Sequence, residues 1–324
     1  MKLYSKDSVT NAVSAMKKGG RMAHAFLLQG EKGAGKKVSA FYIAKTLMCD
    51  DIKDGVPCGK CNQCRRIDEG IHPDVIIPER TGKLMLYNAE TIGEMYRDAF
   101  IMPNDCDVKV YILPDCENIQ ERTQNKMLKL IEEPPDHAYF IFTARDKSSF
   151  LPTIISRVIT IGVPECSEEE CREALRESGK YTDEQIEDAV SVYHGNIGCS
   201  MAYLDGGEGA EEIALCRSIA DAVADGNEYG LCKAFFTVGE DRARLRTVLA
   251  MFDRIIRDVC MIRLHGKDKA ELAGCYRQGA EKLAEKLSFK KAQDIHDLLL
   301  KNIDYCHSNV NVQAAMAALC GSLM

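Results

Sequence analysis

The first half of the chain alternates between short apolar runs and stretches with helical spacing. The runs are near-continuous rather than alternating, which is typical of strands covered on both faces of a sheet. They predict strands at 25–29, 74–78, 109–114, 139–144 and 158–163. Apolar residues recur at helical spacing between them and predict helices at 36–48, 89–100 and 121–133. This alternation indicates an α/β domain with a parallel sheet and helices on both sides.

After Pro164 the strand pattern stops and only helical patterns follow. Two serine/threonine–glutamate/glutamine pairs have the spacing of capping boxes, Ser167 with Glu170 and Thr182 with Gln185. Gly195 stands where the second of these helices would need a C-cap. A glycine-rich break at 204–212 marks a boundary. We therefore expect three domains: an α/β domain at 1–163, a small helical lid domain at 164–206 and an all-α domain at 207–324.

Composition supports a multidomain protein of the cytoplasm. The chain has 324 residues and 46% hydrophobic residues, enough for two or three buried cores. No apolar run approaches the roughly 20 residues of a membrane helix, and the polar start lacks a signal-peptide core. Fifteen cysteines without a secretion signal are not expected to form disulfides.

Charge is distributed unevenly along the chain. The net charge of −7 argues against a protein that coats nucleic acid through bulk charge. Residues 1–66 nevertheless carry 13 Lys and Arg against five Asp and Glu. A phosphate-rich partner should therefore bind to this segment. Lysines that only keep the exposed faces of helices in solvent are the alternative explanation for the same excess.

The segment "GEKGAGKK" at 30–37 has the spacing of a phosphate-binding loop, G-x-x-x-x-G-K. Such a loop presents backbone N–H groups to phosphate oxygens at a helix N-terminus. The candidate nucleotide-binding residues are Gly30, Gly33, Ala34, Gly35, Lys36 and Lys37. The strand before and the helix after it favour this interpretation over a glycine-rich turn with incidental lysines. ATP or ADP can then bind, but Lys37 replaces the hydroxyl that ligates Mg²⁺ and has no lone pair to offer.

A magnesium-dependent NTPase also needs an acidic residue at the end of a second strand. In "KVYILPDCEN", Pro114 falls where that strand would deliver its aspartate. Asp115 comes one position later and would point differently, because side chains alternate along a strand. We interpret Asp115 and Glu117 as the acidic start of a helix.

Four cysteines, Cys49, Cys58, Cys61 and Cys64, are spaced C-x8-C-x2-C-x2-C. Four thiolates complete a tetrahedral Zn²⁺ shell, and each C-x2-C pair chelates from one turn. A redox Cys-x-x-Cys, an iron–sulfur cluster and four unrelated thiols are the alternatives. The spacing favours structural zinc, and a closed four-thiolate shell leaves no position for a catalytic water.

Arg157 precedes the last expected strand, at the edge of the first domain. An exposed arginine there can stabilise transition-state charge at the nucleotide of a neighbouring subunit. An ordinary surface arginine is the alternative. We find no pattern of nucleophile, histidine and acid.

Together these segments resemble the bacterial clamp-loader family of AAA+ proteins, and within it the delta-prime type of DNA polymerase III subunit. The first strand with its loop and the four cysteines match that family in position. "QNKMLKLIEEPPDHAYFIFTA" at 124–144 is similar to its N-x-LLK-x-LEEPP segment and sensor strand, with Thr143 near the sensor position. Ser156 and Arg157 match its Ser-Arg-Cys motif, and "NVNVQAAMAAL" at 309–319 looks like its last helix.

The chain also departs from the family pattern at three positions. The family's motor subunits keep the loop hydroxyl, an Asp-Glu pair and a second-sensor arginine, where this chain has Lys37, Pro114-Asp115 and Gly198. The resemblance implies a subunit of the polymerase holoenzyme that does not hydrolyse ATP itself. It implies that Arg157 acts in trans, as an arginine finger, and that the all-α domain is an oligomerisation collar.

The implied partners are motor subunits and a delta subunit in a hetero-pentamer, with the sliding clamp and primed DNA reached through the complex. Two other functions stay open at this point. One is an active AAA+ ATPase, such as a motor subunit. The other is a zinc-containing nucleic-acid-binding protein with a vestigial loop.

Overall fold

The computed structural model describes residues 2–80, 86–207, 209–267, 269–306 and 311–323. The expected boundary segment 204–212 and the expected last helix within 309–319 each include residues outside this description. The chain forms two compact units. The first comprises Met1–Ala174 with Gly195–Gly198, and the second comprises Leu175–His194 with Cys199–Met324. The division into three domains expected from the sequence stays a prediction.

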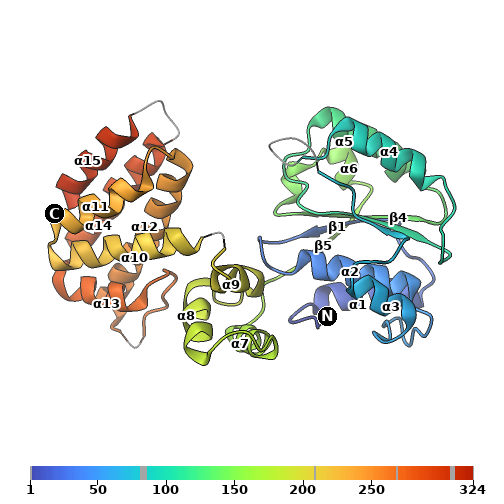
Figure 1. The fold of residues 1–324 in the computed structure, drawn as a ribbon, viewed down its shortest axis with the longest axis horizontal. Helices are drawn as coiled ribbons and strands as arrows, with labels where there is room; N and C mark the ends of the chain where they lie inside the picture. Colours follow the sequence, from blue (N-terminus) through green and yellow to red (C-terminus); the bar gives the residue numbers. More distant parts are fainter. Residues whose placement is uncertain (1, 81–85, 208, 268, 307–310, 324) are drawn as a thin grey trace. The chain divides into compact units, whose positions relative to one another are not determined.

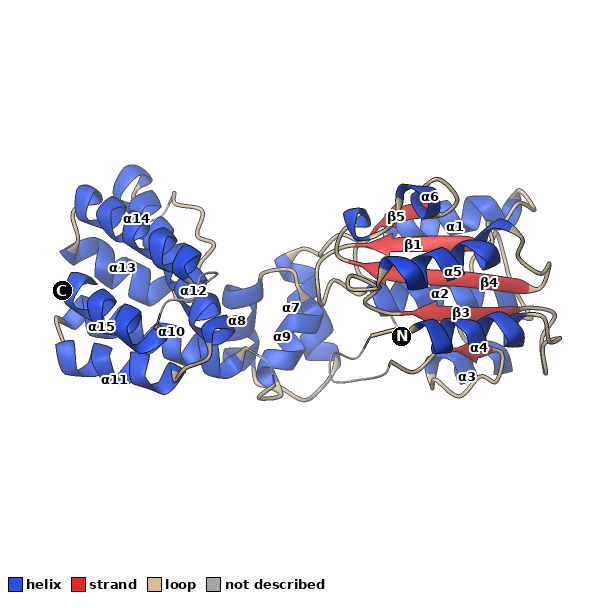
Figure 2. Ribbon diagram, turned by 90° about the horizontal axis from the view of Figure 1, so that it is seen from above, coloured by secondary structure: helices blue, strands red, loops and turns tan. Residues whose placement is uncertain are grey.

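The first unit is built on a five-stranded parallel sheet of order β2-β3-β4-β1-β5 (Figure 2). The predicted strands are confirmed, with ends that differ by a few residues at most. Their bounds are β1 Ala25–Gln29, β2 Val75–Ile76, β3 Lys109–Leu113, β4 Ala138–Ala144 and β5 Ile159–Gly162. β1 and β3 are buried, and both strands end at the same edge of this sheet. The phosphate loop follows β1, and the turn with Asp115 and Glu117 follows β3, so both lie at that edge.

Helices cover both faces of the sheet, as the alternation predicted (Figure 1). One face carries α1 Asp7–Lys18, α2 Lys36–Met48 and α3 Asn62–Asp68; the other carries α4 Ala89–Ala99, α5 Glu121–Glu132 and α6 Pro152–Ile155. Alternate residues of a strand serve the two cores. Leu27 packs with α4 and α5, whereas Phe26 and Leu28 pack with α1 and α2. A short 3₁₀ turn, Lys147–Ser149, precedes α6.

Three helices follow the sheet along the chain: α7 Glu168–Glu177, α8 Asp183–Tyr193 and α9 Ile197–Leu204. Both predicted capping boxes are confirmed by reciprocal hydrogen bonds. The prediction that Gly195 caps α8 is wrong. The helix ends at Tyr193, and His194 is the C-cap, with a positive φ of 50°. Gly195 is needed for a close backbone approach described below.

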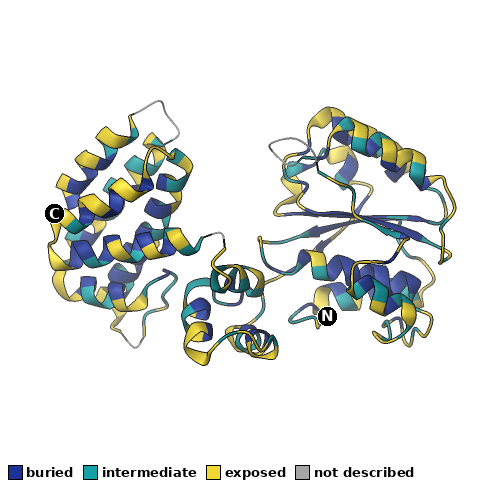
Figure 3. Ribbon diagram, viewed as in Figure 1, coloured by how far each residue is buried: buried dark blue, intermediate teal, exposed yellow. Residues whose placement is uncertain are grey.

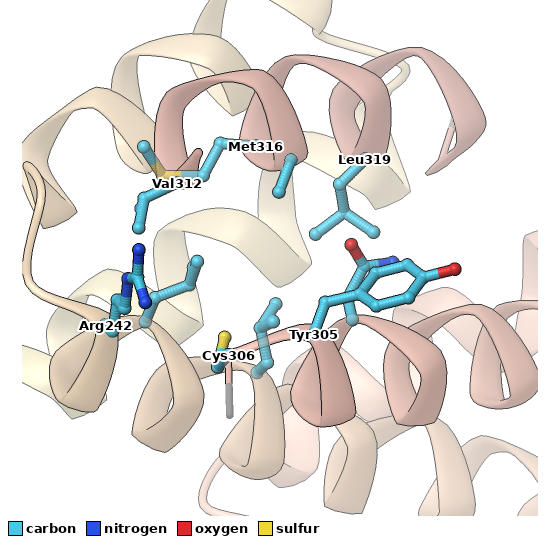
Figure 4. Close-up of a pocket in the computed structure, with 10 residues that line it drawn as sticks. Arg242, Tyr305, Cys306, Val312, Met316 and Leu319 are labelled. Atoms are coloured by element: carbon cyan, nitrogen blue, oxygen red, sulfur yellow. The ribbon is translucent and has the colours of Figure 1, made fainter. Parts of the chain in front are cut away.

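The described residues of the second unit form helices joined by loops, without a strand. After α8 and most of α9 it contains α10 Ala210–Asp225, α11 Glu228–Val238, α12 Arg242–His265, α13 Arg277–Lys286, α14 Phe289–Tyr305 and α15 Val312–Leu323. Figure 3 shows the buried faces of α10 to α15 turned toward one another. A cavity of about 10 Å³ lies between α12, α14 and α15, with Arg242 near one end and Tyr305 near the other (Figure 4). It has room for no more than a water molecule.

Among the described residues, every helix is too short or too polar to cross a membrane.

Candidate functional site

The phosphate loop at 30–37 joins β1 to α2, in the strand–loop–helix context that the motif requires. Gly33 and Gly35 have φ of +81° and +91°, a left-handed conformation that glycine adopts without strain. Ala34 is buried between them, and Gly35 is the N-cap of α2. The backbone therefore has the conformation and the helix N-terminus that suit a phosphate group.

The two lysines of the loop differ in their surroundings. Lys36 is buried and donates from Nζ to the carbonyl oxygens of Gly30 (2.6 Å) and Glu31 (2.8 Å). Burial lowers the pKa of Lys36, whereas the nearby carboxylates of Glu117 and Asp115 raise it. Lys37 is exposed, with its ammonium 5.8 Å from the centre of the Phe41 ring. The position next to the loop lysine thus offers a cation and no ligand for Mg²⁺.

Residues 195–198 are fastened directly to the phosphate loop. Asn196 is buried and donates from Nδ2 to the carbonyl oxygen of Lys32 (2.7 Å), and the N–H of Gly198 donates to the carbonyl of Gly33 (3.1 Å). A Cβ atom at position 198 would lie 2.7 Å from the Cα of Gly33. Position 198 therefore has no room for a side chain unless the backbone moves. In the motor subunits of the clamp-loader family, the corresponding position carries the second-sensor arginine.

We expect Gly195→Ala to lower the free energy of unfolding by about 3 kcal/mol, the upper part of the usual range for overpacking. A Cβ at position 195 would lie 1.6 Å from the carbonyl oxygen of Cys166, whose N–H bonds to the carbonyl of Gly195. Gly93→Ala is the matched control, because a Cβ there meets nothing within 4 Å inside α4. It should leave stability unchanged or raise it by up to about 1 kcal/mol. Equal denaturation midpoints for the two variants would contradict this close approach.

The acidic residues after β3 have other partners. Asp115 has a positive φ of 52°, and its Oδ2 lies 3.0 Å from a guanidinium nitrogen of Arg80. Glu117 accepts the backbone N–H of Arg145 (2.8 Å). The interpretation of both acids as a helix start is wrong, since α5 begins only at Glu121. Through these contacts, both carboxylates stabilise the turn after β3.

Thr143, at the position similar to the family's sensor, also holds this turn. Its buried hydroxyl accepts the N–H of Asp115 (3.0 Å), and its carbonyl accepts the N–H of Cys116 (2.8 Å). Two hydrogen bonds therefore tie the turn after β3 to the end of β4. The hydroxyl of Thr143 therefore has a structural role as a hydrogen-bond acceptor in this turn.

Arg157 lies at the opposite edge of the sheet from the loop. Ile159 of β5 pairs with Phe26 of β1, so Arg157 is level with a residue six positions before Gly30. At about 3.3 Å per residue, this places it about 20 Å from the phosphate loop along the strands. Its side chain is 42% exposed, forms an ion pair with Glu132 (3.0 Å) and donates to the carbonyl of Thr153 (2.9 Å). Arg157 therefore cannot serve its own loop and is accessible to another molecule.

The four cysteines come together as a metal-ligand set. Their sulfur atoms all lie within 4.8 Å of one another, and Cys49 and Cys61 are 3.9 Å apart. Zn–S bonds of about 2.3 Å require sulfur atoms about 3.8 Å apart in a tetrahedron. The group fits a metal ion such as zinc. Gly59, with φ of +68°, makes the turn between the second and third cysteines.

Backbone N–H groups point at three of the four sulfur atoms. Donors and acceptors are Cys58 to Cys49 (3.2 Å), Cys61 to Cys58 (3.3 Å) and Cys64 to Cys61 (3.4 Å). The N–H groups of Lys60 and Cys61 lower the pKa of Cys58 to about 6, whereas burial raises the pKa of Cys64. Burial also raises the pKa of Cys49, so the N–H donors favour the metal-binding thiolate form at Cys58.

The sequence identified all the motif residues, but it did not identify three of their partners or one residue inside the cysteine motif that contacts a buried histidine. These are Arg80, Glu132, Asn196 and Gln63, which contact Asp115, Arg157, the phosphate loop and His72 respectively. Only Gln63 carried a local signal, because it stands between two cysteines of the set.

The sequence comparisons match the chain to subunits of DNA polymerase III. Residues 5–167 match the family described as "DNA polymerase III, delta subunit". The DNA polymerase III subunit gamma of Buchnera aphidicola from Schizaphis graminum is 30% identical over 196 residues, 59% of this chain and 53% of that protein. The subunit delta' of Bacillus subtilis is 25% identical over 318 residues, 92% of this chain and 90% of that protein. The chain spans about half the length of the gamma subunits it matches.

A solved structure is similar along nearly the whole chain. A DNA polymerase III gamma subunit-related protein from Thermotoga maritima aligns with 96% of this chain and 98% of its own, at 15% identity and a TM-score of 0.48.

Proposed function

The chain belongs to the DNA polymerase III delta-subunit family of clamp-loader subunits. Within this family, we propose that the chain is a subunit of the delta-prime type. It does not hydrolyse ATP, and it supplies Arg157 as an arginine finger to a neighbouring ATPase subunit while the complex loads the sliding clamp onto primed DNA. The observation that carries this proposal is the placement of Arg157, exposed and about 20 Å from its own loop. A guanidinium in that position acts only on a nucleotide held by another subunit.

Three features of the chain's own nucleotide site support the absence of hydrolysis. Lys37 replaces the Mg²⁺-binding hydroxyl, the carboxylate of Asp115 is paired with Arg80, and Gly198 leaves no room for a sensor arginine. Phosphoryl transfer depends on positioned charge at these places. The loop in this proposal holds ATP or ADP at most as a bound ligand.

We expect the isolated chain to show no ATP turnover that depends on Lys36. A steady-state assay with Mg-ATP should give the same background rate for the wild-type chain and for Lys36→Ala, because the metal ligands needed for hydrolysis are missing. Lys37→Ala is the matched control for the removal of a neighbouring positive charge. Turnover that Lys36→Ala abolishes and Lys37→Ala spares would identify the chain as an ATPase and refute the proposal.

A motor subunit is the second candidate, and one observation favours it. Gamma and tau subunits match this chain at about 30% identity, against 25% for the delta' subunit of Bacillus subtilis. The delta' match covers 92% of the chain, whereas the gamma match covers 59%. The Lys36 assay separates the two candidates.

In this proposal the four cysteines hold a structural Zn²⁺. When bound, the metal cross-links the segment 49–64 and supplies no reactive position. The residues themselves suit that role: each ligand is on a turn or a helix end, and Ser14 of α1 donates to the carbonyl of Gly55 between the first two cysteines. The cross-linked segment is thereby anchored to the α/β unit.

The second unit would serve as the collar of a hetero-pentamer with motor subunits and a delta subunit. Co-purification with candidate motor subunits, followed by ATPase measurement with and without this chain, tests the assembly directly.

A further inference from the structure

Gln63 links the cysteine cluster to a buried histidine. It stands between Cys61 and Cys64 on the first turn of α3, and its Oε1 lies 3.0 Å from Nε2 of His72. His72 is 3% exposed, and its other nitrogen, Nδ1, accepts the N–H of Asp74 (3.1 Å). A nitrogen that accepts carries no proton, so the neutral ring has its proton on Nε2 and donates it to Gln63. Burial lowers the pKa of His72, which keeps the ring neutral.

Asp74 carries the connection to a distant loop. Its fully buried carboxylate accepts the backbone N–H groups of Asn104 (2.6 Å), Asp105 (2.8 Å) and Cys106 (3.0 Å). Burial raises the pKa of Asp74, but these donors outweigh it and leave the pKa below its usual value. The charged carboxylate thus caps three consecutive amides of one loop.

A second set of contacts ties α3 to the same loop. Arg66 of α3 forms an ion pair with Asp105, and the sulfur of Cys106 lies 3.6 Å from Nε2 of His72. Loop 104–106 is therefore held by α3 directly and through His72 and Asp74. Cys61 is the N-cap of α3, and its sulfur caps the first turn by accepting the N–H of Cys64.

The segment before this loop is apolar and exposed. Phe100, Ile101 and Met102 follow α4 with 55%, 60% and 68% of their surface exposed. More than half of the surface of each residue is in solvent, so burial does little to fix its position. Phe100 also has a ring contact with Tyr96 of α4, with 5.2 Å between the ring centres. The placement of Phe100 to Met102 therefore depends on the anchoring of α4 on one side and of loop 104–106 on the other.

We infer that the metal centre acts as a brace for loop 104–106. The metal fixes the turn from Cys58 to Cys64, this turn fixes Gln63 and Arg66, and these fix the loop through His72, Asp74 and Asp105. The inference rests on the proposed zinc site and adds a consequence for residues about 40 positions away in the sequence. The state of the metal centre controls the order of the loop that positions Phe100 to Met102.

Hydrogen exchange of the full-length chain, followed by mass spectrometry of peptides covering 100–108, tests the brace. The samples are zinc-loaded protein, protein stripped by a chelator under reducing conditions, and zinc-loaded Gln63→Ala and Asn62→Ala. Both stripping and Gln63→Ala should raise the exchange rate of the amides of 104–106, the variant by about fivefold, as for the loss of one net hydrogen bond. Asn62→Ala is the matched control, since Asn62 is an exposed neighbour on the same turn.

The outcomes separate the brace from the zinc proposal. One equivalent of zinc with unchanged exchange at 104–106, both after stripping and in Gln63→Ala, overturns the brace and leaves the metal site standing. Absence of zinc from the purified chain overturns the metal site and with it the metal-dependent brace. If stripping unfolds the whole unit, zinc-loaded Gln63→Ala decides alone: faster exchange at 104–106 supports the brace, and a rate equal to that of Asn62→Ala overturns it.

Discussion

Arg157→Ala should lower ATP hydrolysis at the neighbouring site of the reconstituted complex by about a thousandfold, the lower part of the range for an arginine finger. The guanidinium stabilises charge that develops on the transferred phosphoryl group, and a methyl side chain leaves that charge uncompensated. Single-turnover hydrolysis on complexes assembled with wild-type or variant chain measures the effect. The variant chain should still fold, because an ion pair this exposed contributes less than about 1 kcal/mol.

Two further variants separate the roles of charge, geometry and local packing. Arg157→Lys keeps the positive charge but loses the planar fork that binds two oxygens, so it should recover little activity. Glu132→Gln breaks the ion pair and leaves the guanidinium intact, so hydrolysis should stay close to the wild-type rate. Wild-type turnover with Arg157→Ala, in complexes of unchanged subunit content, would remove Arg157 from the mechanism.

The alternation of apolar runs and helical spacing predicted the sheet well because both signals are local. β1 and α2 have the bounds that the sequence indicated, and the other elements differ by a few residues. Near-continuous apolar runs leave few alternatives to a sheet covered on both faces. The strand order could not be predicted, since it depends on which helices cross over which strands.

The motif residues of the site were also predictable, whereas their contacts were not. Arg80 lies 35 positions from Asp115, and Asn196 lies 164 positions from Lys32, with no pattern to join them. These pairs depend on tertiary contacts. The same applies to Asp115 and Glu117: a local rule favours acids at a helix start, but Arg80 and the N–H of Arg145 take both carboxylates instead.

Gly195 shows how a correct signal leads to a wrong assignment. A glycine after an amphipathic helix favours a C-cap. His194 adopts the positive φ in its place, and the glycine is required because the carbonyl of Cys166 leaves no room for a Cβ. From the sequence, a glycine indicates that a position requires the absence of a side chain. The sequence does not distinguish whether this requirement comes from the backbone conformation or from a neighbouring atom.

Removal of zinc should have the largest effect on the stability of the chain. A ligand present at a thousand times its dissociation constant stabilises the native state by about 4 kcal/mol, and structural zinc binds at least this tightly. For a unit of this size, that loss corresponds to a fall in Tm of about 10 °C. Cys64→Ser should cause the same fall, because Cys64 is the fully buried member of the four-cysteine set and its thiolate would be lost as a ligand.

Metal analysis and thermal unfolding together test this prediction. The wild-type chain, prepared without chelator, should contain one equivalent of zinc, and Cys64→Ser less than half an equivalent. Cys260→Ser is the matched control, a half-buried thiol on α12 outside the cluster, and should keep both the metal and the Tm. A wild-type chain with less than half an equivalent, or one whose Tm does not change when the metal is chelated, would exclude a structural zinc. The first result would leave four thiols without a metal, and the second would leave a bound ion that contributes nothing to the fold.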